Sequence, residues 1–164
     1  MSTDAALEQV IDRTALIENM LNQVIDAYLM PRKEAEQFLW DILLDSSILQ
    51  LGAKVKVVMA ISQELGAELD NTSLHRLVSL RNAFAHHATN AHPVITVGKT
   101  PDTDRLHYTL QVISNSGRVS RTRREEALTE FNDLYAKTRE SLRAFLSAIP
   151  APGDANTEAT NSDA

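Results

Sequence analysis

Helical periodicity is the sequence feature that most constrains how this chain folds. In residues 4–29, apolar side chains recur every three or four positions, which places them on one face of a helix. The same spacing appears in 32–45, in 50–66, in the segment that follows residue 73 and in about 120–148. Several amphipathic helices joined by short connections predict a mainly α-helical bundle of about five helices.

Residues with strong positional preferences mark the ends of these helices. Pro31 ends the first helix, because a proline ring cannot continue it. Gly66 suits the left-handed residue that closes a helix, and the stretch DNTS at 70–73 supplies side chains that cap a helix start. The fourth helix is therefore expected to begin in this stretch.

Two β-branched, alternating runs interrupt the helical pattern before the last helix. Residues 93–97 and 105–113 are separated by the turn-forming sequence GKTPDTD and predict a β-hairpin. The last residues, 150–164, lack large apolar side chains and predict a disordered acidic tail. We expect one helical domain over 1–149, with its hairpin at about 93–113, between the last two helices.

Composition excludes several classes of site and location. The chain has no cysteine, so it has no disulfide framework, thiol nucleophile or cysteine zinc site. It has no apolar run of the ~18 residues that cross a membrane, and its acidic start does not resemble a signal peptide. We expect a cytoplasmic protein without a membrane partner.

Metal and cofactor motifs are also lacking. A metal site built from His86, His87 and His92 with Asp102 or Asp104 would match no compact ligand spacing. No glycine-rich phosphate loop is found either. Neither a metal nor a cofactor is therefore expected.

Charge is distributed unevenly along the chain. The formal net charge is −6, which argues mildly against nucleic acid as a partner. The window 75–124, however, contains eight basic and two acidic residues and all five histidines. An anionic ligand fits this basic middle segment if the fold brings its residues together.

The stretch SLRNAFAHHA, residues 79–88, places polar groups within an amphipathic helix. Asn82 and His86 are four positions apart and share a helix face, whereas Arg81 and His86 point roughly 140° apart on an ideal helix. Arg81 and His86 converge only if the long arginine reaches round the helix, the helix end distorts, or a second chain contributes.

These residue types suit one chemistry in particular. Histidine transfers protons near neutral pH, arginine binds phosphate through a planar fork, and asparagine orients either group. Together they could help an RNA 2′-hydroxyl attack the adjacent phosphate, stabilise the added charge and protonate the leaving oxygen. DNA, which lacks the 2′-hydroxyl, would resist this route. The alternative is a polar network that ties the helix to its neighbours.

The segment RNAFAH resembles the signature of the HEPN superfamily, an arginine followed after four to six residues by a histidine, often with asparagine after the arginine. Arg81, Asn82 and His86 match this signature. The long helices over 5–148 are loosely similar, and LGAKVKVVMAI followed by LRNAFAHH looks like the branch that includes mannitol-operon-repressor-like proteins. Some toxin members carry a tyrosine shortly after the histidine, where this chain has Ala88.

The resemblance implies a homodimer formed through the motif helix, with two motifs across one cleft. It implies a metal-independent endoribonuclease, in a defence or toxin–antitoxin setting, with Arg81 and His86 catalytic and Asn82 in support. RNA would be the substrate, and an antitoxin or regulatory protein a partner. The repressor-like branch implies the alternative, a non-catalytic regulatory or protein-interaction module. Direct DNA binding is a weaker third hypothesis, since no two-helix DNA reader is recognisable.

The stretch RVSRTRREE contains four arginines, Arg118, Arg121, Arg123 and Arg124. Together with His87, these side chains would be substrate-binding residues that hold RNA phosphates near Arg81. The alternative is a solvated turn in which the arginines pair with nearby glutamates. No aromatic residue interleaves with the arginines, and Phe38 and Trp40 are expected to pack against other residues rather than stack on bases.

Overall fold

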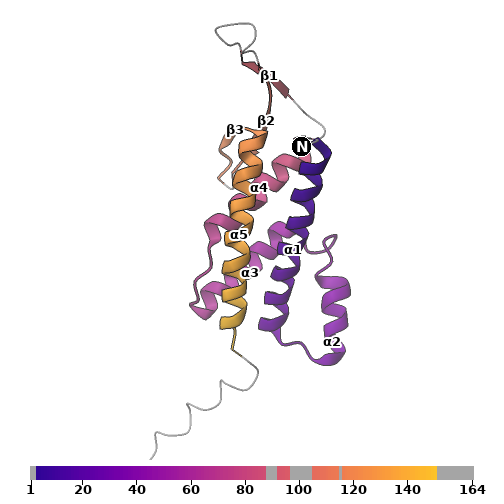
Figure 1. Ribbon diagram of the computed structural model, residues 1–164. Coiled ribbons are helices and arrows are strands. Elements are labelled where there is room, and N and C mark those ends of the chain that lie inside the picture. The colour runs from indigo at the N-terminus through magenta and orange to yellow at the C-terminus, as the bar shows by residue number, and fades with distance from the viewer. Residues whose placement is uncertain (1–2, 88–91, 97–104, 115, 151–164) are drawn as a thin grey trace, which may run out of the picture. The chain divides into compact units, whose positions relative to one another are not determined.

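A computed structural model describes residues 3–87, 92–96, 105–114 and 116–150. The elements in chain order are α1 (Thr3–Leu29), α2 (Lys33–Phe38), the π-helix η1 (Leu39–Leu43), α3 (Leu51–Leu65), α4 (Asn71–His87), β1 (His92–Thr96), β2 (Arg105–Ile113), β3 (Val119–Arg123) and α5 (Arg124–Ala148) (Figure 1). The chain is mainly helical, with antiparallel strands between α4 and α5, which confirms the predicted fold class. The predicted tail at 150–164 lies outside the described residues except for Pro150.

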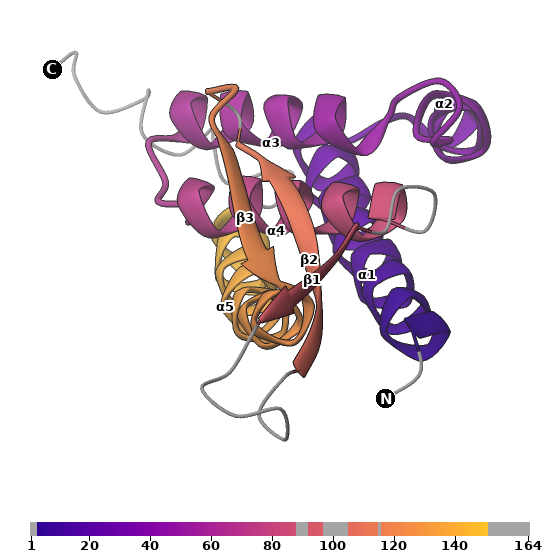
Figure 2. The same cartoon turned by 90° about the horizontal axis from the view of Figure 1, so that it is seen from above.

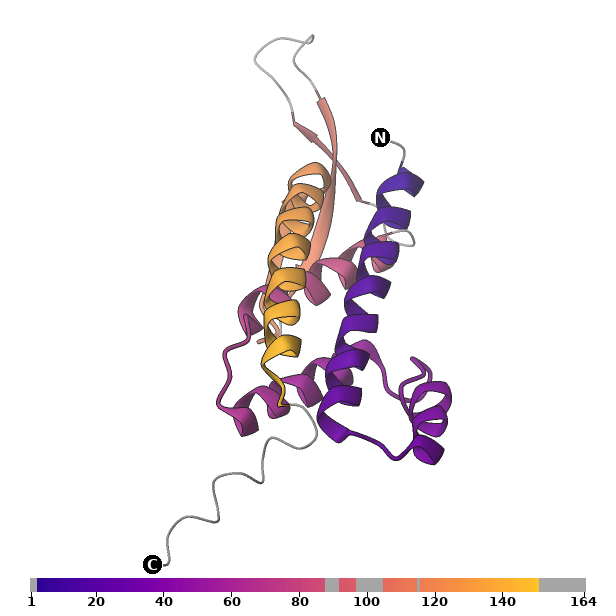
Figure 3. The same cartoon turned by 60° about the horizontal axis from the view of Figure 1, so that its bottom comes forward.

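Backbone contacts group the chain into two compact units. The first unit comprises residues 1–18 and 70–140, and the second comprises 19–69 and 141–164. The helices α1 and α5 contribute to both units, and Figure 3 shows each of them as one continuous ribbon.

The core of the first unit is built from one face of each helix and from the inner face of the sheet. Its fully buried apolar side chains come from four elements and include Val10, Ile17, Leu74, Leu77, Leu80, Leu110, Val112, Ala127 and Phe131. The helix α4 packs against β2, which places the motif helix directly on the sheet. Leu110 and Val112 are two positions apart, so they share the face of β2 that is buried.

The sheet contains a third strand that sequence patterning missed. The strands follow the order β1, β2, β3, and both neighbouring pairs are antiparallel (Figure 2). We expected the last helix to begin at about residue 120, but Val119–Arg123 forms β3 and α5 begins at Arg124. The earlier start was wrong because these residues pair with β2, across a turn in which Gly117 adopts a φ of 77°.

The second unit contains an irregular helix where one continuous helix was expected over 32–45. The α-helix α2 is six residues long and passes into η1, where the Leu44 amide donates to the Leu39 carbonyl at 2.9 Å. The helix α3 ends at Gly66, which has a φ of 60° and confirms the predicted C-cap.

Phe38 was expected to be a packing residue, and this expectation was wrong. Its side chain is 56% exposed. The adjacent Leu39, the first residue of η1, is 4% exposed and is the buried residue of this turn.

A lysine is buried inside the second unit. Lys54 on α3 is 1% exposed, and its Nζ donates to the Leu44 carbonyl at 2.6 Å. A buried ammonium is costly unless it is hydrogen-bonded, and the Leu44 carbonyl lies just past the end of η1. The contact therefore connects α3 to the segment that follows η1.

We predict that Lys54→Ala lowers the free energy of unfolding by about 3 kcal/mol, because it removes both a buried aliphatic stem and the hydrogen bond to Leu44. The matched control is Lys56→Ala, two positions away and exposed, which should change stability by less than about 0.5 kcal/mol. Urea unfolding of both variants tests this. Equal losses of stability in the two variants would show that the Lys54 contact stabilises the protein no more than an exposed lysine does.

Candidate functional site

The helix that carries the motif begins at an aspartate cap. Asp70 Oδ1 accepts a hydrogen bond from the Ser73 amide at 3.0 Å, and the Asp70 carbonyl accepts one from the Leu74 amide at 3.2 Å. This confirms that the stretch 70–73 caps the fourth helix. Hydrogen bonds from the Ser73 side chain and backbone hold the pKa of Asp70 below its ordinary value.

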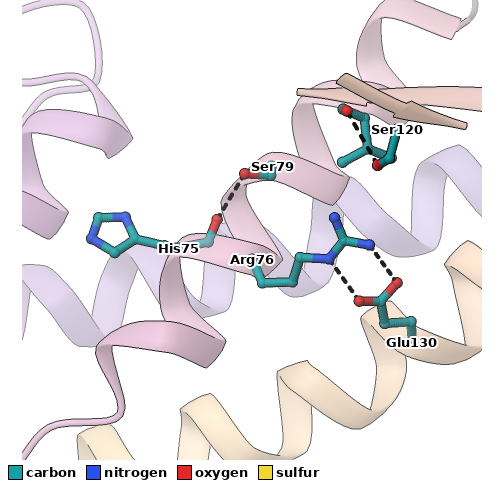
Figure 4. Close-up of polar contacts among 6 residues, drawn as sticks. His75, Arg76, Ser79, Ser120 and Glu130 are labelled. Atoms are coloured by element: carbon teal, nitrogen blue, oxygen red, sulfur yellow. Dashed lines mark hydrogen bonds and ion pairs between the residues drawn. The ribbon is translucent and has the colours of Figure 1, made fainter. Parts of the chain in front are cut away.

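An ion pair fixes the middle of α4 to α5. The Arg76 guanidinium donates through Nε and a terminal nitrogen to the two carboxylate oxygens of Glu130, at 2.6 and 2.8 Å (Figure 4). The pair is half-buried, and hydrogen bonding to Glu130 raises the pKa of Arg76. This pair was not predicted from the sequence. The two residues are 54 positions apart, and no local sequence pattern links residues so far apart.

The motif residues Arg81, Asn82 and His86 lie on the last two turns of α4. Asn82 and His86 are exposed, and Arg81 is half-buried. The Arg81 guanidinium donates through Nη1 to Asn82 Oδ1 at 3.2 Å. The guanidinium thus contacts the residue next to it in sequence, Asn82, which lies four positions before His86 on the same face of an ideal helix.

The Nε atom of Arg81 is enclosed and has no hydrogen-bond partner among the described residues. The hydrogen bond of the Arg81 guanidinium therefore comes from a terminal nitrogen, Nη1, and goes to Asn82. The side chain of His87, the fourth polar residue of the stretch, lies outside the described residues.

The four arginines of the stretch 118–126 are divided between different surroundings. Arg121 and Arg123 alternate with the inward-facing positions of β3 and pair with Gln111 and Thr109 across the ladder, so they lie on the face of the sheet opposite α4. Arg118 is exposed in the turn before β3. We refer to Arg121 and Arg123 as the sheet arginines.

The last arginine of the stretch, Arg124, is the one placed against the motif helix. Its Cζ lies 5.7 Å from the ring centroid of Phe84, which is buried on α4. Arg123 is exposed, and its Nε lies 3.8 Å from Oε1 of Glu126. An exposed ion pair of this kind contributes little to stability. The arginines therefore do not form a single cluster around Arg81.

The described side chains form no group of three or more histidine, aspartate or glutamate residues that could hold a metal ion. Of the histidines considered as ligands, His86 is described, whereas the side chains of His87 and His92 lie outside the described residues, as do Asp102 and Asp104. None of the helices in the described part of the chain combines the length and apolar character that a membrane crossing requires.

Comparisons with known proteins found no match. A scan against protein-family models, a search of curated proteins and a search of solved structures each gave no significant similarity to this chain.

We predict that Asp70→Ala lowers the free energy of unfolding by about 1 kcal/mol at neutral pH, because α4 loses its N-cap. Since the pKa of Asp70 is lowered in the folded state, its contribution is present above pH about 4 and is lost as the pH falls through the lowered pKa. Urea unfolding of wild type and variant at decreasing pH should show the difference shrink. Glu68→Ala, an exposed acidic control, should show no such loss, and a pH-independent Asp70 difference would contradict the prediction.

Proposed function

We propose that this protein is a metal-independent endoribonuclease of the HEPN type that acts as a homodimer. The observation that carries the proposal is the hydrogen bond from Arg81 to Asn82 on the last turns of α4. It directs the guanidinium towards the surface that also bears the exposed His86. An imidazole can transfer protons to and from the reacting oxygens, and a cation can stabilise the charge that develops on the phosphate during RNA cleavage.

In the proposed reaction, the 2′-oxygen of a ribose attacks the adjacent phosphorus and the bond from phosphorus to the 5′-oxygen breaks. His86 of one protomer accepts the proton of the 2′-hydroxyl, and His86 of the partner subunit donates a proton to the leaving 5′-oxygen. Arg81 stabilises the charge that develops on the phosphate oxygens, and Asn82 orients Arg81. The products are a 2′,3′-cyclic phosphate end and a 5′-hydroxyl end.

Dimerisation would place an arginine and a histidine of the motif opposite each other, which a single helix does not do. On a single α4, positions 81 and 86 point roughly 140° apart, and the sequence places them five residues from one another. Two copies of the motif surface meeting across a symmetry axis would bring an arginine from each protomer near the histidine of the other. The exposure of Asn82 and His86 is compatible with such a meeting.

A second candidate function is a protein-interaction module without catalysis. It is favoured by exposed apolar side chains in a short segment of the second unit: Phe38, Ile42, Leu43 and Ile48 are between 44% and 62% exposed. Clustered exposed apolar residues are typical of protein interfaces. In this case the motif would organise an interface, and an antitoxin or regulatory protein would be the partner.

We predict that the purified dimer cleaves mixed-sequence single-stranded RNA in EDTA and leaves 2′,3′-cyclic phosphate ends. The variant His86→Ala should lose at least about 100-fold in rate and remain dimeric, because an exposed acid–base group contributes to chemistry rather than to folding. His75→Ala is the matched control, an imidazole on the same helix outside the motif. Absence of cleavage by a folded dimer, or dissociation of His86→Ala, would favour the interaction module.

We predict a separate effect for the sheet arginines if RNA crosses the outer face of the sheet. The double variant Arg121→Gln/Arg123→Gln should reduce the slope of log affinity against log salt concentration by about 1.4, because each lost phosphate contact contributes about 0.7 for single strands. Fluorescence anisotropy with labelled RNA measures this, and Arg32→Gln/Lys56→Gln gives the same charge change at exposed positions of the second unit. An unchanged slope would show that the sheet arginines do not hold RNA.

A further inference from the structure

A second group of basic residues lies on α1 and α5 of the first unit, away from the motif sequence. The Cζ atoms of Arg13 and Arg139 lie 5.1 and 6.0 Å from the ring centroid of Tyr135. Gln9 is one turn before Arg13 on α1, and Asn132 is one turn before Tyr135 on α5. We refer to these five residues as the arginine–tyrosine cluster.

Hydrogen bonds within the cluster occupy the amide oxygen of Asn132. Asn132 Oδ1 accepts from Arg13 Nη1 at 2.6 Å and from Gln9 Nε2 at 3.3 Å. Each of the two guanidinium groups carries up to five N–H donors and no acceptor. The two arginines therefore offer more donors than these hydrogen bonds use.

The charge of the cluster is not neutralised within the described residues. Arg76 and Arg123 have carboxylates within ion-pair distance, whereas neither Arg13 nor Arg139 has one in the described part of the chain. Two cations near one ring repel each other, and a cation–π contact at an accessible site offsets only a small part of that repulsion. A bound anion would remove the repulsion. Because Arg13 and Tyr135 are half-buried, charge-assisted hydrogen bonds there are less weakened by water.

We propose that the arginine–tyrosine cluster binds a phosphate group. One guanidinium fork satisfies the two oxygens of a carboxylate, whereas two forks match the larger number of oxygens and the higher charge of a phosphate. The phosphate comes either from a free polyphosphate or nucleotide or from the backbone of an RNA strand. The proposal does not rest on RNA cleavage, since none of the five residues belongs to the motif.

The test follows the Nε–H resonances of Arg13 and Arg139 by NMR in the full-length protein, assigned with the variants Arg13→Gln and Arg139→Gln. Inorganic pyrophosphate and a short single-stranded RNA are titrated separately, which distinguishes the two sources of phosphate. Arg139→Gln is the principal affinity variant, because the Arg139 side chain is exposed and contacts the Tyr135 ring at the edge of ring-contact distance. Arg139→Lys tests whether the fork is needed in addition to the charge, and Arg32→Gln is the control for the charge change.

We expect at least one probe to shift both resonances and Arg139→Gln to weaken its binding roughly tenfold. Arg32→Gln should stay within about twofold of wild type, and Arg139→Lys should restore only part of the loss. Shifts with RNA alone would assign a strand site, and shifts with both probes would assign a site that needs only the phosphate. The proposal is overturned if neither probe shifts the two resonances, or if Arg32→Gln weakens binding as much as Arg139→Gln.

The variant His86→Ala should bind either probe at this cluster as wild type does, so loss of cleavage and loss of phosphate binding are separable.

Discussion

The ion pair between Arg76 and Glu130 is the contact on which the position of the motif helix depends. It joins α4 to α5 through two short hydrogen bonds, and both side chains are partly shielded from water. The helix α4 also packs against β2, whose buried residues include Leu110 and Val112. The helix that carries Asn82 and His86 is therefore held both by an ion pair to α5 and by packing on the sheet.

This placement gives a physical reason for the composition of α4. A helix that only packed would carry apolar residues on its inner face and arbitrary polar residues outside. In α4, Leu77, Leu80 and Phe84 form the buried face, and the polar residues Arg81 and Asn82 contact each other. Arg124 places its guanidinium over the Phe84 ring of α4. One of the four arginines of the basic stretch therefore contacts the motif helix, whereas the sheet arginines lie on the other face of the sheet.

Basic residues of this acidic chain are sorted by the fold into three groups with different surroundings. Arg76 is neutralised by a carboxylate, the sheet arginines face away from α4, and Arg13 and Arg139 share one aromatic ring. Two candidate surfaces for a phosphate-bearing ligand lie outside the motif: the sheet arginines, and Arg13 with Arg139. Among the sheet arginines, Arg123 lies near the carboxylate of Glu126. This sorting explains how a chain with a net charge of −6 retains surfaces suited to anions.

The sequence by itself determined α1, α3 and α4, the cap at Asp70, the end of α3 at Gly66 and the strands β1 and β2, because these features follow from local periodicity and from residues with strong backbone preferences. It also identified Asn82 and His86 as neighbours on one helix face.

Only the tertiary structure decided that Val119–Arg123 is a strand, since a five-residue segment followed by a strong helix gains its conformation by pairing with β2. The tertiary structure likewise decided that Arg124 meets Phe84 and that Arg13 and Arg139 meet at Tyr135. Such contacts join residues up to more than a hundred positions apart, and no local pattern records them because their free energy comes from packing between elements rather than from the preferences of either element alone.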